Sequence, residues 1–135
     1  MIDLVRASKA LSDETRVRTL NLLLAKECCV CEVMHCLKIS QTRASRSLKI
    51  LFDAGFLKMR EEGSFTLYSI KKNKSNRVRS LLVQALEEDF GRSVAARKER
   101  ERLTSAKRFD CKAVIKAKYK TLPDELPQHD CCATH

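Results

Sequence analysis

The chain has 135 residues, of which 44% are hydrophobic and 33% charged, and its formal net charge is +10 at pH 7. This length fits one compact domain with an appendage and excludes two full domains, and no stretch approaches the roughly 20 apolar residues that a membrane span needs. The basic balance favours a polyanionic partner, with nucleic acid before an anionic membrane surface.

The first part of the chain predicts three helices, over residues 3–11, 13–26 and 29–37. Each range repeats apolar residues at the three- and four-residue spacings of a single helix face. Ser12 is expected to be the N-cap of the second helix, because its hydroxyl can accept a hydrogen bond from the first turn.

Residues 41–54 predict a fourth helix whose two sides differ. Ser40 is the expected N-cap, and Gly55 stands where the helix end favours a residue free to adopt positive φ. The expected buried side carries Ala44, Leu48 and Leu51. The opposite side carries polar and basic residues, namely Gln41, Thr42, Arg43, Ser45, Arg46 and Lys49.

Two short alternating runs, 56–60 and 65–70, flank a turn that contains glycine and predict a β-hairpin. Residues 74–90 predict a fifth helix with a broad apolar stripe, ended by Gly91. We expect this order of elements to form an α+β, mostly α, winged helix-turn-helix with five core helices and a hairpin wing.

The remaining residues predict an appendage. Residues 92–109 carry 7 Lys and Arg against 2 Asp and Glu and are helix-prone, whereas residues 121–135 contain both prolines and no periodicity. The sequence thus predicts a DNA-binding and dimerisation domain over residues 1–91, followed by a basic helical extension and a flexible, cysteine-containing tail over residues 92–135.

Double-stranded DNA is the partner that this arrangement predicts. In a winged helix-turn-helix, one helix packs one side on its neighbours and carries donors and acceptors into the major groove with the other. The candidate DNA-contacting residues are therefore Ser40, Gln41, Thr42, Arg43, Ser45, Arg46 and Lys49. The hairpin, flanked by Lys58, Arg60, Lys71 and Lys72, is the expected wing.

Seven cysteines are many for a protein without an export signal. The chain starts without the basic and apolar regions of a signal peptide, so we expect a cytoplasmic protein with reduced thiols. Metal binding or redox sensing is then the economical interpretation. Cys36, beside Leu37, is expected to be a small core residue, and Cys111 an isolated thiol.

Three stretches of this sequence, 11–20, 27–33 and 40–49, resemble the ArsR/SmtB family of metalloregulatory transcriptional repressors. The resemblance runs from about residue 4 to residue 90. It implies a homodimer, paired through the first and fifth helices, that represses an operator and releases it when a thiophilic ion binds. The Cys-Val-Cys of residues 29–31 is similar to the arsenite/antimonite subtype.

The resemblance implies As(III) or Sb(III) as the inducer, with Cys29 and Cys31 as ligands. As(III) binds three thiolates, and Cys28 is the favoured third ligand. Cys131 or Cys132 is the alternative, and a methylated arsenical would need only two thiolates. Side chains two residues apart point about 200° apart on a regular helix, so ion binding is expected to unwind the start of the third helix.

Two other functions use the same residues. A redox-sensing repressor of the same fold would respond through a disulfide or sulfenic acid at these cysteines. A thiol-dependent enzyme, such as a reductase, is less well supported, because the chain has only 3 glycines and no Cys-x5-Arg loop. We therefore expect no enzymatic activity.

Overall fold

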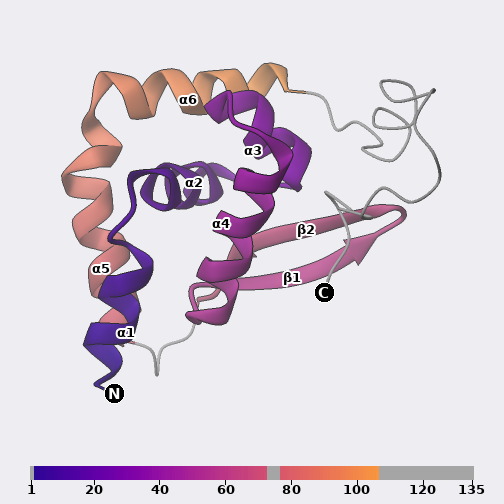
Figure 1. Cartoon of the computed structure of the whole chain (residues 1–135). Helices are drawn as coiled ribbons and strands as arrows, with labels where there is room; N and C mark the ends of the chain where they lie inside the picture. The colour runs from indigo at the N-terminus through magenta and orange to yellow at the C-terminus, as the bar shows by residue number, and fades with distance from the viewer. Residues whose placement is uncertain (1, 73–76, 107–135) are drawn as a thin grey trace.

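Six α-helices and one β-hairpin make up the part of the computed structural model that is described, residues 2–72 and 77–106 (Figure 1). The elements follow in the order α1 (Asp3–Ala10), α2 (Glu14–Ala25), α3 (Val30–Leu37), α4 (Gln41–Asp53), β1 (Leu57–Glu62), β2 (Phe65–Ile70), α5 (Arg77–Glu88), the 3-10 helix η1 (Phe90–Arg92) and α6 (Val94–Ser105). This is the winged helix-turn-helix that the sequence predicts, with α6 as a sixth helix. None of the described helices is long and apolar enough to cross a membrane.

The helices surround α2. Helices α1 and α5 lie side by side at one end, α4 packs on α2 and α3, and α6 passes over α2 and α3 (Figure 1). The hairpin contacts α2 and α4 at its base and extends away from the helices. The recognition helix of the motif, α4, is thus held between the other helices and the wing.

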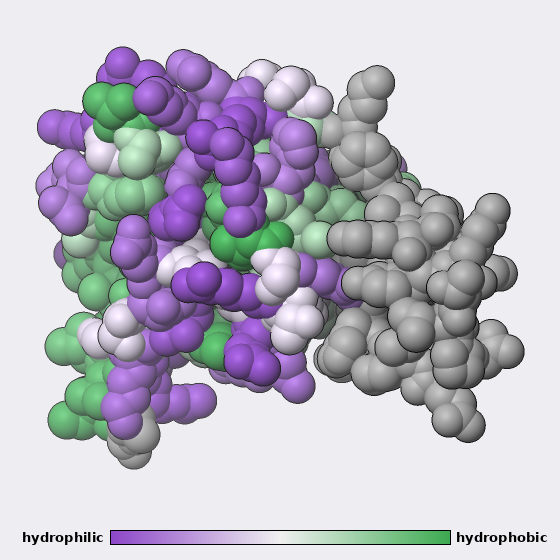
Figure 2. Space-filling view, turned by 45° about the horizontal axis from the view of Figure 1, so that its top comes forward, coloured by the Kyte–Doolittle hydropathy of each residue, from purple (hydrophilic) through white to green (hydrophobic). Residues whose placement is uncertain are grey.

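The face shown in Figure 2 is mostly hydrophilic, but large hydrophobic side chains are exposed on α1 and α5. Leu4 is 51% exposed and Leu81 is 52% exposed, and Ile2 and Val5 add to the same group of exposed side chains. The apolar face that the sequence predicts for residues 3–11 is therefore only partly buried within one protomer, through Ala7.

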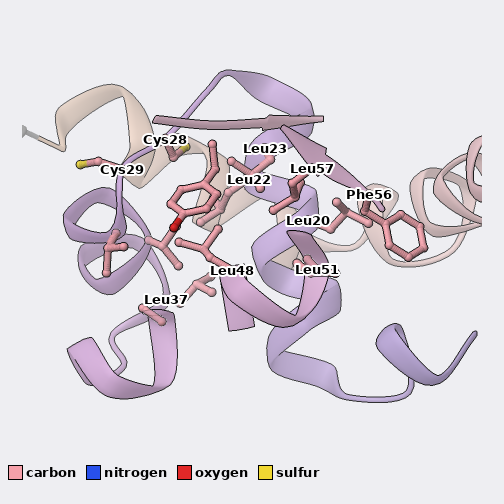
Figure 3. Packing of buried hydrophobic residues seen from close by; sticks show 14 of the residues in the cluster. Leu20, Leu22, Leu23, Cys28, Cys29, Leu37, Leu48, Leu51, Phe56 and Leu57 are labelled. Atoms are coloured by element: carbon pink, nitrogen blue, oxygen red, sulfur yellow. The ribbon is translucent and has the colours of Figure 1, made fainter. Parts of the chain in front are cut away.

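Helix α4 has the two sides that the sequence predicts. Ala44, Leu48 and Leu51 are fully buried, within a core that includes leucines of α2 and both strands (Figure 3). The Ser40 Oγ accepts a hydrogen bond from the Arg43 backbone N–H at 3.2 Å, which confirms Ser40 as the N-cap.

The end of α4 is fixed by a Schellman motif. The Gly55 N–H donates to the Phe52 carbonyl, and the Phe56 N–H donates to the Leu51 carbonyl, each at 3.0 Å. Gly55 has a φ of +86°, and a Cβ built on it would lie 2.9 Å from the Arg79 Nε. The predicted role of this glycine as the helix terminator is confirmed.

Arg79 of α5 connects this helix end to α1. Its Nε donates to the Ala54 carbonyl at 2.6 Å, and its two terminal nitrogens pair with the Asp3 carboxylate at 2.8 and 2.9 Å. The guanidinium also lies over the Phe56 ring, 5.8 Å from the ring centre. The side-chain hydrogen bond from Arg79 lowers the pKa of Asp3.

The two strands of the hairpin are antiparallel, with Leu57 opposite Ile70 and Glu62 opposite Phe65. Strand β2 has the predicted bounds, whereas β1 begins one residue later and ends two residues later than predicted, because Glu61 and Glu62 continue it and leave only two residues for the turn. Gly63 takes the first turn position with a φ of +60°, where glycine is favoured.

Two predicted helix boundaries are wrong. Asp13, not Ser12, is the N-cap of α2, because its carboxylate accepts the Arg16 N–H while the Ser12 hydroxyl donates to the Lys9 carbonyl. Helix α5 ends at Glu88 rather than at Gly91, which lies inside η1. The chain turns there and enters α6.

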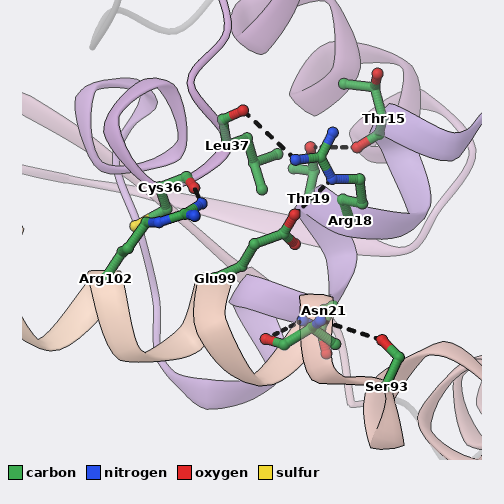
Figure 4. Close-up of polar contacts among 10 residues, drawn as sticks. Thr15, Arg18, Thr19, Asn21, Cys36, Leu37, Ser93, Glu99 and Arg102 are labelled. Carbon is green, nitrogen blue, oxygen red and sulfur yellow. Dashed lines mark hydrogen bonds and ion pairs between the residues drawn. The ribbon is translucent and has the colours of Figure 1, made fainter.

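Helix α6 joins the core through a buried polar network (Figure 4). The Arg18 Nε donates to Glu99 Oε1 at 2.6 Å, and the Glu99 side chain is only 4% exposed. Arg102 donates to the Cys36 carbonyl at 2.9 Å, and Arg100 donates to the Asn21 side chain at 2.7 Å. The segment in which the sequence predicts a basic helical extension therefore packs directly on α2 and α3.

Cys36 is fully buried, so its predicted role as a small core residue is confirmed. Burial raises the pKa of its thiol from 9.0 to about 11, with a further contribution from the charge of Glu32. The folded protein therefore favours the neutral thiol.

The Gly55→Ala variant is expected to lose about 1–3 kcal/mol of unfolding free energy, because alanine would combine a strained φ with a contact against Arg79. Gly63→Ala is the matched control, since Gly63 also has positive φ but no atom lies within 4 Å of its built Cβ. Urea unfolding of both variants measures the difference. Equal losses would show that the contact with Arg79 has no effect.

A second expectation concerns alkaline pH. Because an unfolded thiol ionises near 9.0 and the Cys36 thiol only near 11, the stability that Cys36 contributes is fully present below pH 9 and is lost as the pH rises toward 11. Urea unfolding at several pH values in this window should show a steeper decline for the wild type than for Cys36→Ala. Parallel declines would contradict this assignment.

Candidate DNA interface and thiolate site

The polar side of α4 faces the solvent. Thr42, Arg43, Arg46 and Lys49 are exposed, and Gln41 and Ser45 are half-buried. Within residues 2–72 and 77–106, no ion pair involves the three basic side chains of this side, Arg43, Arg46 and Lys49. They are thus available for phosphates or base edges.

A cleft of about 400 Å³ lies between the start of α2 and this side of α4. Its lining residues come from the two helix N-termini and the exposed side of α4, namely Asp13, Arg16, Ser40, Thr42, Arg43, Arg46, Ser47 and Ile50. Helix N-termini carry partial positive charge and favour anions. The cleft therefore combines three arginine side chains with two helix N-termini, and it also contains the Asp13 carboxylate, which caps α2.

The hairpin carries additional exposed cations at its base, Lys58, Lys71 and Lys72. Arg60, which was predicted to be a fourth basic residue of the wing, forms ion pairs with Glu27 and Glu62. Three of the four basic residues predicted for the wing therefore face the solvent without an ion pair to any described residue, and Arg60 instead ties the hairpin to the segment after α2.

Cys29 lies outside the helix in which the sequence places it. It is the N-cap of α3, with an extended backbone, and the helix begins at Val30. Its sulfur accepts the Glu32 N–H, and the Glu32 carboxylate accepts the Cys29 N–H at 3.1 Å, which makes a capping box. The predicted conflict between helical Cys29 and Cys31 side chains therefore does not arise, and no helical turn has to unwind to release Cys29.

Cys28 is held more rigidly than its neighbour. Its N–H donates to the Tyr68 carbonyl at 3.0 Å and its carbonyl accepts the Tyr68 N–H at 2.8 Å, so it pairs with β2. The thiol is fully buried, and burial raises its pKa strongly. Cys28 and Cys29 are both fully buried at the edge of the packed core (Figure 3). These properties disfavour the thiolate form that a metal ligand requires.

Cys31, in the first turn of α3, takes part in a disulfide, whereas Cys28 and Cys36 are free thiols. Across the described ranges, no group of three or more His, Cys, Asp or Glu side chains is arranged to hold a metal ion. The structure therefore brings Cys28, Cys29 and Cys31 to the start of one helix without assembling them into a three-ligand site. The alternative ligands Cys131 and Cys132 lie outside the described residues.

Sequence reasoning missed the polar residues by which α6 contacts the helix-turn-helix. Glu99 and Arg102 were assigned only to a charged extension, although both contact other helices. One signal was available: Ala96, Glu99 and Leu103, which are buried, follow each other at the three- and four-residue spacings of a helix face. The pattern is hard to recognise from sequence because one of its three members is a glutamate, which is rarely buried without a partner.

Comparison with known proteins agrees with this geometry. Residues 13–58, which span α2 to the start of β1, match the family described as "Bacterial regulatory protein, arsR family". The matched segment contains the whole helix-turn-helix, the cap of α3 and the exposed side of α4.

Three relatives illustrate the similarity. A cadmium resistance transcriptional regulatory protein homolog of Staphylococcus aureus is 40% identical over 51% of this chain and 58% of its own length. One arsenic resistance transcriptional regulator of Pseudomonas putida is 44% identical over 46% of this chain and 49% of its own length. A second one from the same organism is 40% identical over 58% of this chain and 70% of its own length. The chain thus spans about half the length of the first two of these relatives.

A solved structure has the same fold. It is the homodimeric winged helix-turn-helix DNA-binding domain of a possible ArsR-family regulator from Mycobacterium bovis, 28% identical, with a TM-score of 0.55 over 64% of this chain and 81% of that one. Three findings agree: this fold is shared, the family match covers the helix-turn-helix, and one relative is 40% identical over 70% of its own length. The chain belongs to the ArsR family of bacterial regulatory proteins.

Proposed function

We propose that this protein is a transcriptional repressor that binds double-stranded operator DNA through α4. The observation that carries the proposal is the division of this helix: three buried apolar residues fix its position, and its other side presents polar and basic side chains to the solvent. Side chains of these types read base edges and contact phosphates in the major groove. The relatives are named as transcriptional regulators, and none is named as an enzyme.

The wing and the cleft supply the sequence-independent part of this binding. Exposed Lys58, Lys71 and Lys72 can neutralise phosphates on one side of α4, and the cleft at the start of α2 can receive a phosphate on the other. The net charge of +10 adds general attraction to DNA.

The repressor is a homodimer in this proposal, formed through the exposed apolar residues of α1 and α5. Leu4 and Leu81 are each about half exposed in a single protomer, and large exposed apolar groups of this kind mark interaction surfaces. A homodimeric structure with the same fold supports the pairing, and two-fold symmetry suits a palindromic operator.

Replacing Arg46 by alanine is expected to weaken binding about tenfold, because one specific base or phosphate contact contributes roughly 1–3 kcal/mol. Arg97→Ala removes the same charge from the exposed surface of α6 and serves as the matched control. The DNA affinities of the two variants are measured by fluorescence anisotropy, with a duplex that the wild type selects from a random pool. We expect two protomers to bind each duplex. An equal loss of DNA affinity in the two variants would show that Arg46 contributes only its positive charge and no specific contact.

The inducer in this proposal is trivalent arsenic or antimony, bound by Cys29 and Cys31. Two observations support this pair: both cysteines lie at the start of α3, and Cys29 stands outside the helix as its N-cap. Cys31 would bind after its disulfide is reduced. Soft thiolates are the donors that such ions prefer. All three cysteines are buried, but Cys28, the third ligand favoured by sequence, is the hardest of the three to recruit, because its backbone is paired with β2.

Ligand binding at this position can be transmitted to the DNA interface. Withdrawing the Cys29 sulfur from the Glu32 N–H would remove half of the capping box of α3. Helix α3 packs directly on α4. A shift of α3 would therefore move the recognition helix and lower its affinity for DNA.

One observation favours a second candidate function. Cys31 is disulfide-bonded, so a redox-sensing repressor of the same fold would use this sulfur. Oxidation would join two thiols as a disulfide and pass two electrons and two protons to an oxidant such as a peroxide. The DNA-binding surface would be the same, and only the signal that releases it would differ.

Arsenite added to the reduced protein on its selected duplex should release the wild type, whereas a Cys29→Ser, Cys31→Ser variant should stay bound. Cys111→Ser is the control for a thiol substitution outside the site and should respond as the wild type does. The third ligand is then identified by comparing the arsenite response of Cys28→Ser with that of the double variant Cys131→Ser, Cys132→Ser. The variant that is not released lacks the ligand. Release by peroxide but not by arsenite, reversed by a reductant, would replace the arsenic proposal with the redox one.

A further inference from the structure

The turn between α3 and α4 is the part of the helix-turn-helix that sets the angle of the recognition helix, and it is strained. Lys38 has a φ of 56° and a ψ of 48°, in the left-handed region that favours glycine. A non-glycine residue pays conformational free energy for this backbone, so surrounding contacts must hold it.

Those contacts come from two other helices. Arg102 of α6 donates to the Cys36 carbonyl at 2.9 Å, and Arg18 of α2 donates to the Leu37 carbonyl at 3.5 Å (Figure 4). These are the last carbonyls of α3, which have no donor within their own helix. Cations at this end also interact favourably with the helix dipole.

The two arginines are themselves connected. Arg18 forms a 2.6 Å ion pair with Glu99 of α6, one turn before Arg102 on the same helix. Glu99 is 3% exposed, and its second carboxylate oxygen has no hydrogen-bond partner among the described atoms. A buried carboxylate costs free energy, and breaking its single ion pair would cost more. The pair therefore fixes Arg18 and α6 relative to each other.

We propose that α6 positions the recognition helix, with Arg102 and the Arg18–Glu99 pair holding the turn between α3 and α4. Arg102 is a positioning residue: it acts through the Cys36 carbonyl and does not itself contact DNA. The inference rests on the proposed DNA-binding function, and it adds a role for a segment that lies beyond the family match over residues 13–58.

Arg102→Met is the main test, because methionine keeps an apolar stem and removes the guanidinium. We expect about a tenfold loss of affinity for the duplex selected by the wild type, since a charged hydrogen bond that fixes the helix is lost. Affinity for a scrambled duplex should change less than about twofold, and the slope of log affinity against log salt should stay that of the wild type. Arg102→Lys should restore most of the lost affinity.

Arg97→Met is the matched control, because it makes the same change at an exposed position of α6. It should leave the preference for the selected duplex unchanged. Equal losses of Arg102→Met on both duplexes, with a salt slope reduced by about one, would identify a phosphate contact instead and overturn the proposal.

Amide hydrogen exchange of the DNA-free protein separates this inference from the proposed function. The Ile39 N–H, bonded to the Met34 carbonyl in the turn, should exchange at least about fivefold faster in Arg102→Met. The Ala54 N–H at the far end of α4 should not change and shows that the variant is folded. Unchanged exchange at Ile39 overturns the inference, whether or not the wild type binds DNA.

Glu99→Gln is the second variant, in case Arg102→Met does not fold. It keeps the shape of the side chain and removes its charge. Like Arg102→Met, it should raise the exchange rate of the Ile39 N–H and lower the preference for the selected duplex. Wild-type protein that prefers no duplex would contradict the proposed function. A wild type that does prefer one, together with a Glu99→Gln variant that behaves as the wild type does, would contradict only the positioning role.

Discussion

Burial of one side of α4 against α2 and α3 is the constraint on which the proposed DNA-binding surface depends. Ala44, Leu48 and Leu51 have no exposed surface, and rotating the helix would bring polar residues into the core and leucines into water. Core packing at this density allows little adjustment. The position of every polar side chain on the opposite side of α4 is therefore a consequence of hydrophobic packing.

Helix α3 is held at its two ends by contacts of different kinds. At its start, the capping box between Cys29 and Glu32 joins neighbours in the chain, and the buried Glu32 carboxylate also pairs with Lys26 at 2.8 Å. At its end, guanidinium groups from two helices bind the terminal carbonyls. The start of α3 is therefore held by residues close in the chain, and its end by side chains of α2 and α6.

The sequence was informative wherever a local rule determined the structure. The alternation of the hairpin, the division of α4, Ser40 as a cap and the positive φ at Gly55 all follow from nearest neighbours along the chain, and all are confirmed. Choosing between Ser12 and Asp13 as a cap was not possible in this way, because both side chains can accept the hydrogen bond. The tertiary contact of Arg16 with the carbonyls of α1 settles which of them does so.

The candidate sites were less predictable, for physical reasons. The polar side of α4, which we propose contacts DNA, could be predicted because its residues share one helix face. The cysteine positions could be identified too, but not the surroundings that distinguish them: the pairing of Cys28 with Tyr68 joins residues far apart in the chain. The same holds for Glu99, whose burial depends on Arg18, a residue of another helix.

Arg79 carries a consequence for the spacing of DNA half-sites. It bonds the Ala54 carbonyl at the end of α4 and the Asp3 carboxylate of α1, so one side chain links the recognition helix to the surface through which two protomers would pair. In such a dimer, this contact would help to fix the separation of the two recognition helices before DNA binds, because it holds α4 in place relative to the pairing surface of its own protomer. An operator would have to match that separation, about one helical turn of DNA or a multiple of it, and insertion of a few base pairs between its halves would bring one half to the wrong face of the duplex.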